Sequence, residues 1–505
     1  MDNDVIFLNT DDKTAVSADG TLWGNRLLAY SQYDVPSAPL CSIFITGYNR
    51  LHKTKYAVEC VLKYTTDIDY ELILIDNGSS DGTFEYFQSV EHPKKRIIKV
   101  SKNIGGGFSF GAIRKVYSGK YLVGVSNDVY VTANWLSNLL RCFESDPRIG
   151  FVEPLSSNIS NLQQYDLGGW KDFDEMQGKA ASFNISDPSK WEERMRLISI
   201  LSIFSRQVLD SVGIGDFAFV HDFSEDDLTA RLRRMGYKLM LCKDTWVCHD
   251  HDLDHMEDKD PAAFRASLES GRRLYREKYH GIDPWDDINN YELQLLAPLG
   301  TWDMPQGEIS ALCVDARCGT PVLEIRNRLR RRGRLDVSNW AFTTRAKYFL
   351  DLQTTEAEVK CDRVDFIQNH YADETFDIVA LCEPLNCYHS APITLLQSLY
   401  NFAKRGGILL FKLRNTSDYN ALMRVAGFGG ANDEDCPAVM SIDEVSKALK
   451  LFGGKNISIG GESYRLSQDD LAIIKSWLGK VNPNYNNQNL QNLTIKDYMF
   501  SVSKG

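Results

Sequence analysis

Several carboxylates in this sequence stand where they could bind a metal ion or accept a proton. The apolar run 121–126 is followed by Asn127 and Asp128, so a buried strand is predicted to end in an acid. In an open α/β sheet, ligands bind beyond the carboxyl ends of the strands, where such an acid faces a crevice. Mg²⁺ suits this position because proteins hold it through one or two carboxylates and the phosphates of a substrate. The alternative is that Asn127 and Asp128 only cap the turn into the next helix.

A second group of acids follows Ser224 at the predicted start of a helix: Glu225, Asp226 and Asp227. A carboxylate there could act as a general base that removes a proton from a hydroxyl group. The dipole at a helix N-terminus also favours acids, and serine is a good N-cap, so a purely structural role is the alternative. Downstream, residues 249–255 read HDHDLDH, a composition found in metal-binding tracts.

The pattern of the chain predicts a scaffold that would bring such residues together. Apolar segments at 41–46, 71–76, 96–101 and 121–126 predict strands that alternate with helices. This order predicts an α/β fold with a mainly parallel, doubly wound sheet. Right-handed crossovers bring successive strand ends to one edge, so the polar side chains that follow the strands should converge. These side chains belong to residues 46–50, 76–81 and 126–128.

A glycine-rich loop precedes the fourth strand, with Gly105, Gly106 and Gly107 followed by Gly111. Its backbone N–H groups could approach phosphates or a sugar, although simple packing of a turn on a helix is the alternative. The spacing is neither that of the Rossmann dinucleotide fingerprint nor that of the Walker loop. The loop therefore argues against a dehydrogenase and against an NTPase.

Length and composition limit the remaining possibilities. At 505 residues the chain exceeds one ordinary core, which predicts two domains or three. A formal net charge of -11 argues against a general nucleic-acid binder, which needs a basic surface. Eleven scattered cysteines are interpreted as reduced, buried thiols, and the N-terminus lacks the features of a signal peptide. Because no run approaches about 20 apolar residues, we expect a cytoplasmic protein without a membrane anchor.

The ordered series SIFITGYNR, ELILIDNGSSDGT, KNIGGGFSFGAIRK and YLVGVSND resembles the nucleotide-sugar half of family 2 glycosyltransferases with the GT-A fold. FVEPLSSN and FSEDDLTARLRRMGYKLMLCKDTWVCHDH are similar to later segments of the same family. The resemblance covers about residues 40 to 280 and implies transfer of a sugar from a nucleotide-diphosphate donor. It implies that Asp76 contacts the nucleotide base. The other implied donor contacts are Thr46, Tyr48, Arg50, Gly105, Gly106, Asn127 and Asp128.

The resemblance also implies a metal site. Asp128 takes the place of the last acid of the metal motif, and His249 that of the histidine which completes the site for Mn²⁺ or Mg²⁺. Ser126 and Asn127 stand where the usual D-x-D motif begins, so weak or dispensable metal binding is the alternative. The other histidines of the tract are interpreted as part of a solvated loop on the acceptor side.

The general base is assigned in the same way. Aligned on Arg231, Glu225 takes the position of the family's catalytic aspartate and Asp227 that of its second acid. Ser224 replaces the usual glutamate, so Asp226 remains the alternative base beside the preferred Glu225. One base with in-line attack implies inversion at the anomeric carbon.

The second half of the chain resembles a class I methyltransferase over about residues 308–420, through FDIVAL and AKRGGILLFKLRN. Methyltransferases that bind S-adenosylmethionine place glycines around the Cys-Gly-Thr sequence, where this chain has Arg317 and Pro321. An arginine at this point would crowd the approach of the backbone to a ligand. The only acid near the second strand is Asp336. Binding of S-adenosylmethionine is therefore not expected, and packing, dimer formation or acceptor recognition is the expected role.

The predicted organisation is an N-terminal extension, a GT-A domain, a linker and a Rossmann-like, methyltransferase-like domain, at residues 1–38, 39–282, 283–307 and 308–505. The arginine-rich segment 326–334 is expected to be a solvated helix face, or to attract an acidic protein or an anionic glycan. Residues 466–480 predict an amphipathic helix, and the asparagine-rich residues 482–493 predict a loop.

These features together predict an inverting, metal-dependent glycosyltransferase. The expected donor is a UDP-sugar, with UDP-N-acetylglucosamine the first to test. The acceptor is either a surface glycan or serine and threonine hydroxyls of a surface protein such as flagellin. The alternatives are a bifunctional enzyme that also methylates the sugar, and a non-catalytic binding protein. A homo-oligomer formed through the C-terminal domain is a further expectation.

Overall fold

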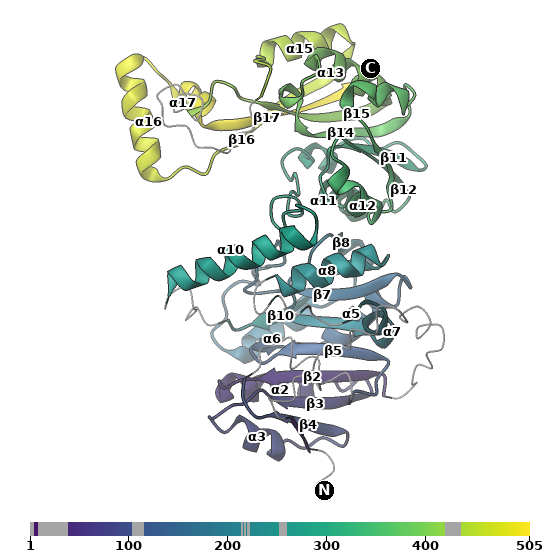
Figure 1. The fold of residues 1–505 in the computed structure, drawn as a ribbon, viewed down its shortest axis with the longest axis vertical. Helices are drawn as coiled ribbons and strands as arrows, with labels where there is room; N and C mark the ends of the chain where they lie inside the picture. The colour runs from purple at the N-terminus through teal and green to yellow at the C-terminus, as the bar shows by residue number, and fades with distance from the viewer. Residues whose placement is uncertain are drawn as a thin grey trace. The chain divides into compact units, whose positions relative to one another are not determined.

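The computed structural model describes residues 5–8, 39–103, 116–213, 216, 219, 223–251, 260–419 and 436–505. The chain forms two compact units, residues 1–289 and 290–505. Each unit is an α/β structure built on a mainly parallel sheet, which confirms the predicted fold class (Figure 1). The boundary between the units lies within the stretch 283–307, for which a linker is predicted. Among the described helices, none has both the length and the apolar character needed to cross a membrane.

The sheet of the first unit is built from ten strands among the described residues: β1 Val5–Leu8, β2 Cys41–Gly47, β3 Tyr70–Asp76, β4 Lys95–Val100, β5 Tyr121–Ser126, β6 Val129–Tyr130, β7 Ile149–Ser156, β8 Trp191–Arg194, β9 Leu201–Ser205 and β10 Lys238–His249. Their order is β1-β4-β3-β2-β5-β9-β7-β10-β6, with β8 beside β10. In the parallel pairs, Gly47 lies opposite Asp76, and Thr46 lies opposite Ser126. Three strand ends therefore meet at one edge of the sheet, as right-handed crossovers predict.

The helices of the first unit are α2 Leu51–Tyr64, α3 Thr83–Ser89, α5 Trp135–Phe143, α6 Phe173–Phe183, α7 Arg206–Val212, α8 Ser224–Arg234 and α10 Pro261–Lys278, with the 3-10 turn η3 Pro188–Lys190. The core between α5 and strands β7 and β10 contains the fully buried Trp135, Trp246 and Phe151. α8 ends at Arg234 because Gly236 takes a left-handed conformation (φ 89°), after which β10 begins.

The second unit contains seven described strands: β11 Ile309–Val314, β12 Val337–Thr343, β13 Glu358–Cys361, β14 Phe376–Pro384, β15 Ala403–Arg414, β16 Gly454–Ser463 and β17 Ile495–Lys504. Their order is β13-β12-β11-β14-β15-β17-β16. The first five are parallel and follow the 3-2-1-4-5 order of a doubly wound sheet, with the reversal between β11 and β14. β17 runs antiparallel to both of its neighbours. The helices are α11 Thr320–Arg331, α12 Phe349–Gln353, α13 Pro392–Phe402, α15 Ile442–Leu451, α16 Gln468–Val481 and α17 Asn487–Thr494, with 3-10 turns η4 Ala297–Gly300, η5 Ala346–Tyr348, η6 Val364–Asn369 and η7 Leu385–Cys387.

Two expectations for the second unit are wrong. The asparagine-rich stretch predicted as a loop contains α17, because Asn486 and Asn489 accept hydrogen bonds from each other's backbone in a capping box. The arginine-rich segment is not a solvated face. Its arginines Arg328, Arg332 and Arg334 donate to backbone carbonyls of residues 293–305. These bonds hold the start of the second unit against α11.

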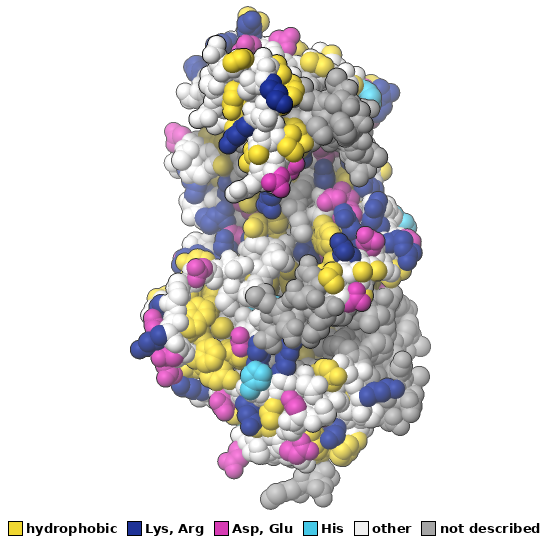
Figure 2. Space-filling model, turned by 90° about the vertical axis from the view of Figure 1, so that its left-hand side faces the viewer, with side chains coloured by type: hydrophobic (Ala, Val, Ile, Leu, Met, Phe, Trp, Pro, Cys, Tyr) yellow, Lys and Arg dark blue, Asp and Glu magenta, His cyan; other side chains and the backbone are white. Residues whose placement is uncertain are grey.

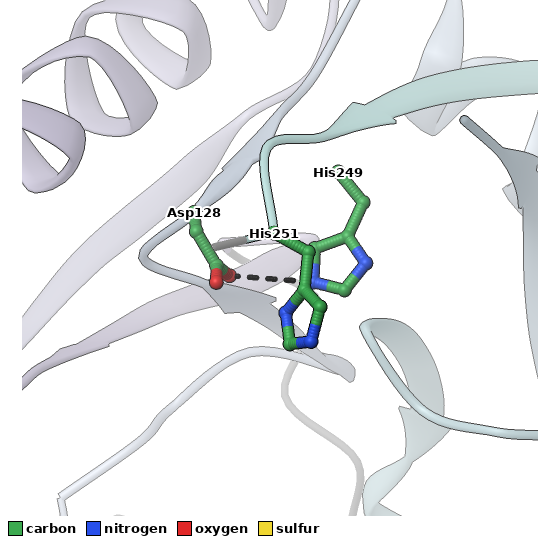
Figure 3. A group of neighbouring side chains, drawn as sticks. All are labelled: Asp128, His249 and His251. Carbon is green, nitrogen blue, oxygen red and sulfur yellow. Dashed lines mark ion pairs between the residues drawn. The ribbon is translucent and has the colours of Figure 1, made fainter. Parts of the chain in front are cut away.

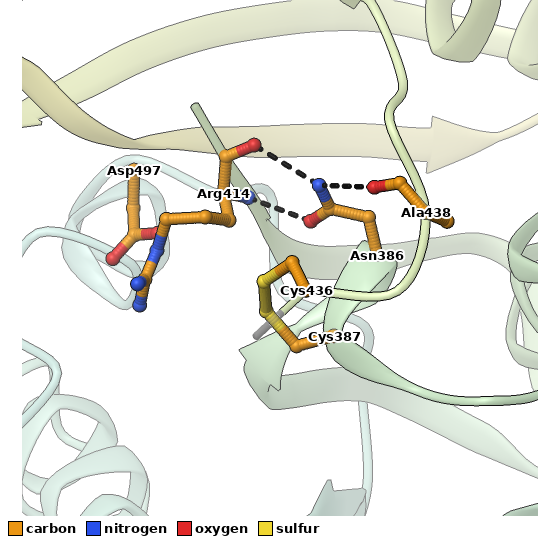
Figure 4. Close-up of a disulfide and its surroundings, with 6 residues drawn as sticks. All are labelled: Asn386, Cys387, Arg414, Cys436, Ala438 and Asp497. Atoms are coloured by element: carbon orange, nitrogen blue, oxygen red, sulfur yellow. Dashed lines mark hydrogen bonds and ion pairs between the residues drawn. A yellow bond between two sulfur atoms is a disulfide. The ribbon is translucent and has the colours of Figure 1, made fainter. Parts of the chain in front are cut away.

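A disulfide between Cys387 and Cys436 corrects the prediction that all cysteines are reduced. Figure 4 shows it beside Asn386, which donates to the carbonyls of Arg414 and Ala438 at 3.1 and 3.2 Å. The other nine cysteines are free, and all of them are buried except Cys361. The two partners are 49 residues apart and belong to no recognisable motif, so the sequence offers no signal for this bond.

Candidate functional site

His249, the last residue of β10, lies beside Asp128 because β10 pairs antiparallel with β6, which starts directly after Asp128. The distance between His249 Nε2 and Asp128 Oδ1 is 3.7 Å. His251 joins this pair, since ligand atoms from the three residues lie within 4.8 Å of one another. Figure 3 shows the carboxylate and both imidazole rings around a common space. His251, which the sequence analysis assigned to a solvated loop, is thus a further candidate ligand, while His255 lies outside the described residues.

The ring of His249 is oriented by the segment that follows β7. Its Nδ1 lies 2.5 Å from the carbonyl oxygen of Asn158, and its backbone N–H donates to Ser157 Oγ at 2.9 Å. A carbonyl only accepts hydrogen bonds, so Nδ1 carries a proton, and Nε2 is the ring nitrogen that a cation beside Asp128 would bind. Metal-binding histidines are commonly fixed in this way by a backbone carbonyl. The residues present therefore fit a divalent cation.

Asp128 does not cap a helix, which was the alternative to a metal role. The next helix, α5, begins at Trp135, and Asn134 takes its cap position. The side chain of Asp128 is 11% exposed, and Arg50 Nη1 approaches its Oδ2 at 3.8 Å. The distances from Asp128 to Arg50 and His249 both exceed a hydrogen bond. Within the described part of the chain, the carboxylate thus keeps lone pairs for a cation.

The predicted base-contact residue, Asp76, is completely buried at the end of β3. Its Oδ1 accepts a hydrogen bond from the Ser79 backbone at 2.9 Å, whereas its Oδ2 has no partner among the described residues. A buried carboxylate oxygen without a partner is unfavourable unless a ligand supplies a donor. Asp76 is therefore suited to receive an N–H group.

The other predicted donor residues surround this strand edge unequally. Tyr48 is 46% exposed, and Arg50 has a left-handed backbone (φ 59°), a strained conformation that is common near binding sites. Thr46 is half-buried on β2. Asn127 is turned toward α2, where it donates to Thr54 Oγ1 at 3.0 Å. The predicted Gly105 and Gly106 lie outside the described residues.

The three acids of α8 have different surroundings. Asp226 is 3% exposed and both of its oxygens accept from Arg196, one of them at 3.2 Å. Burial raises the pKa of Asp226, and the Arg196 guanidinium opposes that rise. Asp227 is fully buried and accepts from Arg231 and Tyr279 at 2.9 and 2.7 Å. Glu225 is half-buried.

The start of α8 also differs from the expectation of a serine cap. Ser224 is the first helical residue, and Phe223, in a left-handed conformation, takes the cap position without a side-chain bond. The acids therefore do not belong to a serine-capped turn. What fixes them is the set of cationic partners around Asp226 and Asp227.

Residues 42–191 match the family model for Glycosyl transferase family 2. The chain is 23% identical over 266 residues to an uncharacterized protein, y4gI, of Sinorhizobium fredii, which covers 48% of this chain and 28% of that protein. It is 30% identical over 125 residues to a chondroitin synthase of Escherichia coli, which covers 24% of this chain and 18% of that protein. The chain thus spans less than a third of the length of either relative.

A solved structure of a mannosyltransferase of Pyrobaculum calidifontis in complex with GDP-Man and Mn²⁺ is also similar. The TM-score is 0.36 at 16% sequence identity, and the match covers 56% of this chain and 86% of that one.

The first unit contains one further buried acid that sequence reasoning missed. Glu153, in the middle of β7, is completely buried. Its Oε2 accepts from the Leu201 backbone at 3.3 Å, and its Oε1 has no partner among the described residues. Burial raises the pKa of Glu153 well above its ordinary value, and the charge of Glu225 adds to the rise. An acid inside the apolar run IGFVEPL is the signal that could have identified it.

The second unit has a cleft where its strand order reverses, a usual place for ligands in such sheets. Its volume is about 450 Å³. Asp315 lines the cleft and is tied down by hydrogen bonds from the Thr344 backbone and the Tyr388 hydroxyl, at 2.7 and 2.6 Å. Arg317 is bound to Glu383, with Nε 3.1 Å from Oε1. Asp336 precedes β12 and so lies at the opposite end of that strand.

Proposed function

We propose that this protein transfers a sugar from a nucleotide-diphosphate donor to a hydroxyl group, with inversion and with a divalent cation held by Asp128, His249 and His251. The observation that carries the proposal is this cluster of a carboxylate and two imidazoles. It stands at the strand edge where Asp76 and Arg50 also lie.

The donor is a nucleotide whose base presents a ring N–H group. Asp76 Oδ2 accepts this group, which uracil and guanine carry and which the pairing edges of adenine and cytosine lack. Tyr48 is exposed next to Arg50, where it can contact the base or the ribose. A UDP-sugar agrees with the family resemblance, and UDP-N-acetylglucosamine is the first donor to test.

The cation is Mn²⁺ in preference to Mg²⁺. Mg²⁺ favours oxygen ligands, whereas two of the three side chains here offer imidazole nitrogen. When bound, the ion stabilises the negative charge that develops on the leaving diphosphate. Arg50, 3.8 Å from Asp128, adds a positive charge on the same side of the site.

Glu225 is the general base that accepts the proton of the acceptor hydroxyl. Asp226 is engaged through both oxygens by Arg196, and Asp227 by Arg231, Lys278 and Tyr279. These two acids hold the start of α8 in place. With one base and in-line attack, the configuration at the anomeric carbon inverts.

The acceptor is a surface glycan or the hydroxyl groups of a surface protein such as flagellin, and we place the reaction in the cytoplasm. Similarity to a protein named chondroitin synthase supports the glycan. Methyl transfer by the second unit is not part of the proposal, because Arg317 is paired with Glu383 in the loop where a cofactor-binding glycine is expected. We assign that unit to packing, to acceptor recognition or to oligomer formation.

A donor screen tests the proposal. Purified protein is incubated with Mn²⁺ and each common nucleotide sugar, and release of the nucleotide diphosphate is measured with and without candidate acceptors. We expect one donor, with uracil or guanine as its base, to be consumed by the wild type and not by Asp128→Asn. If protein with an intact fold turned over none of the donors, the non-catalytic binding protein would be the remaining alternative.

A further inference from the structure

An arm formed by α16 and α17 connects strands β16 and β17 of the second unit. Figure 1 shows the two helices standing away from the sheet at the end of these strands. α16 is a well-formed helix with Ser467 and Asp470 in a capping box. Its Ile474 and Leu478 are buried. The other side of the helix faces away from these contacts.

The outer side of α16 is apolar at its centre. Ile473, Trp477 and Val481 follow each other at intervals of four residues, so they lie on one face. Their exposed fractions are 60%, 43% and 63%. Figure 2 views the side from which α16 projects, and hydrophobic side chains gather with charged ones on its upper part. Large apolar residues grouped in this way on a surface mark an interaction site.

Opposite charges flank this apolar stripe. Asp469 precedes Ile473 by four residues and Lys480 follows Trp477 by three, so both lie on the same face. Neither charge has an ion-pair partner among the described residues. From the N-terminal to the C-terminal end of the helix, this face therefore carries an acid, two large apolar residues and a base.

We propose that α16 pairs with α16 of a second copy of this chain in an antiparallel arrangement. When the two helices cross near Lys475, Ile473 packs on the partner's Trp477, and Asp469 meets the partner's Lys480. Two-fold symmetry repeats both contacts, as it does in every isologous interface. A parallel arrangement would instead place like charges against each other, which is unfavourable. The charges of α16 are thus complementary to those of a second α16 only when the two helices run antiparallel.

The dimer rests on one short helix from each copy, so the interface belongs to the small class below about 1,200 Å², which is typical of weak and transient complexes. Trp477 is its central anchor, because buried tryptophans carry a large share of binding energy. The face of α16 is thus the surface through which the oligomer expected from the sequence would form. It does not depend on the proposed sugar transfer.

The oligomeric state of the full chain tests the proposal. Mass is measured by light scattering on a sizing column or by sedimentation, up to about 100 μM, where a dimer with a Kd of about 10 μM is mostly formed. We expect the wild type to approach twice its 57.3 kDa, and Trp477→Asp to remain monomeric at the same concentration. Leu451→Asp is the matched control, because Leu451 is 86% exposed on α15 of the same unit and should leave the mass unchanged.

A charge exchange tests the antiparallel direction. Asp469→Lys and Lys480→Asp should each weaken the dimer about tenfold, since each places like charges in contact. An equimolar mixture of the two variants should restore it, because both charge contacts of the mixed dimer then join opposite charges. Charges that serve only the helix dipole would give no such rescue.

Three results would overturn the proposal. The first is a wild type that stays monomeric at about 100 μM, which would leave this face to a different protein or uncovered. The second is a dimer that Trp477→Asp does not weaken, which would place the interface elsewhere. The third is a mixture of the two charge variants that stays monomeric.

Discussion

Arg196 binds both carboxylate oxygens of Asp226, and the two side chains are only 12% and 2% exposed. A carboxylate held in this way cannot take a proton from an acceptor without breaking a buried ion pair. Its pKa is raised by burial, while Arg196 stabilises the charged form. If Glu225 is the base, its replacement lowers the rate of transfer, whereas replacement of Asp226 lowers the stability of the fold. Measuring both quantities for both variants therefore identifies the base.

Glu225→Gln should abolish most catalysis and leave the fold intact. The amide keeps the shape of the side chain but cannot accept the proton, so the rate of transfer should fall by about 10²- to 10⁴-fold. The thermal unfolding midpoint should match that of the wild type. Turnover is measured with the donor and acceptor found in the screen. A variant with near-normal turnover would rule out Glu225 as the base.

Asp226→Asn should act mainly on stability. The change leaves the buried guanidinium of Arg196 without its counter-charge, and breaking a buried pair in this way costs about 3–5 kcal/mol. The free energy of unfolding is measured by denaturant titration of the full chain. The double variant Arg196→Met, Asp226→Leu is the control, because replacing both partners with apolar residues should recover part of the loss. Unchanged stability with lost activity would make Asp226 the base.

The three-residue metal cluster predicts selective binding of Mn²⁺. Titration of the donor-free protein with Mn²⁺, followed by electron paramagnetic resonance, should show one site that is lost in Asp128→Asn. His251→Ala should weaken binding about tenfold or more, and Mg²⁺ should compete poorly because two ligands are nitrogen atoms. His370→Ala is a matched control, since His370 pairs with Asp362 at 2.9 Å in the second unit. Equal Mn²⁺ affinity of wild type and Asp128→Asn would contradict the site.

Asp128 was accessible to prediction because its signal is local. An apolar strand that ends in an acid can be read from eight consecutive residues, and parallel topology then brings such ends together. His251 carried a weaker local signal, because residues two apart in an extended segment point to the same side, as His249 and His251 do. The composition of the tract favoured a loop instead.

Contacts between distant segments were not accessible. Arg196 and Asp226 are 30 residues apart, and nothing in either segment marks its partner. The bond between Cys387 and Cys436 has the same character. The solvated-face prediction for the arginines of α11 was wrong because a charge pattern does not reveal nearby backbone carbonyls. These contacts form only when the chain folds, and no local pattern in the sequence indicates them.

Glu153 should make stability depend on pH. Because burial raises its pKa, the folded chain keeps the proton over a range in which the unfolded chain has released it. The free energy of unfolding should therefore fall as pH rises above about 4.3, by about 1.4 kcal/mol per pH unit until the folded pKa is reached. Glu153→Gln should remove this fall, so its stability advantage should be absent at pH 4 and grow toward neutral pH. Denaturant titrations at several pH values measure the difference.

Asp146 is the control of opposite sign for this measurement. Burial alone would raise its pKa, but hydrogen bonds from Arg148 and Lys238 outweigh burial and lower it. The stability that it contributes is thus present at neutral pH and is lost as pH falls. Asp146→Asn should be less stable than the wild type at pH 7 and approach it in acid. A gap between Glu153→Gln and wild type that does not change with pH would contradict the assignment for Glu153.

The disulfide between Cys387 and Cys436 should be measurable and should stabilise the second unit. Alkylation of the unfolded protein without reductant should modify nine cysteines, and prior reduction should raise the number to eleven. By restricting the unfolded chain between two cysteines 49 residues apart, the bond should contribute about 2–4 kcal/mol, which Cys436→Ser should remove. Cys361→Ser is the control, since Cys361 is free and exposed. Such bonds rarely persist in a reducing cytoplasm. Alkylation of all eleven thiols in protein taken directly from cells would therefore mean that the disulfide is absent in the cell. Asn386 alone would then link these segments.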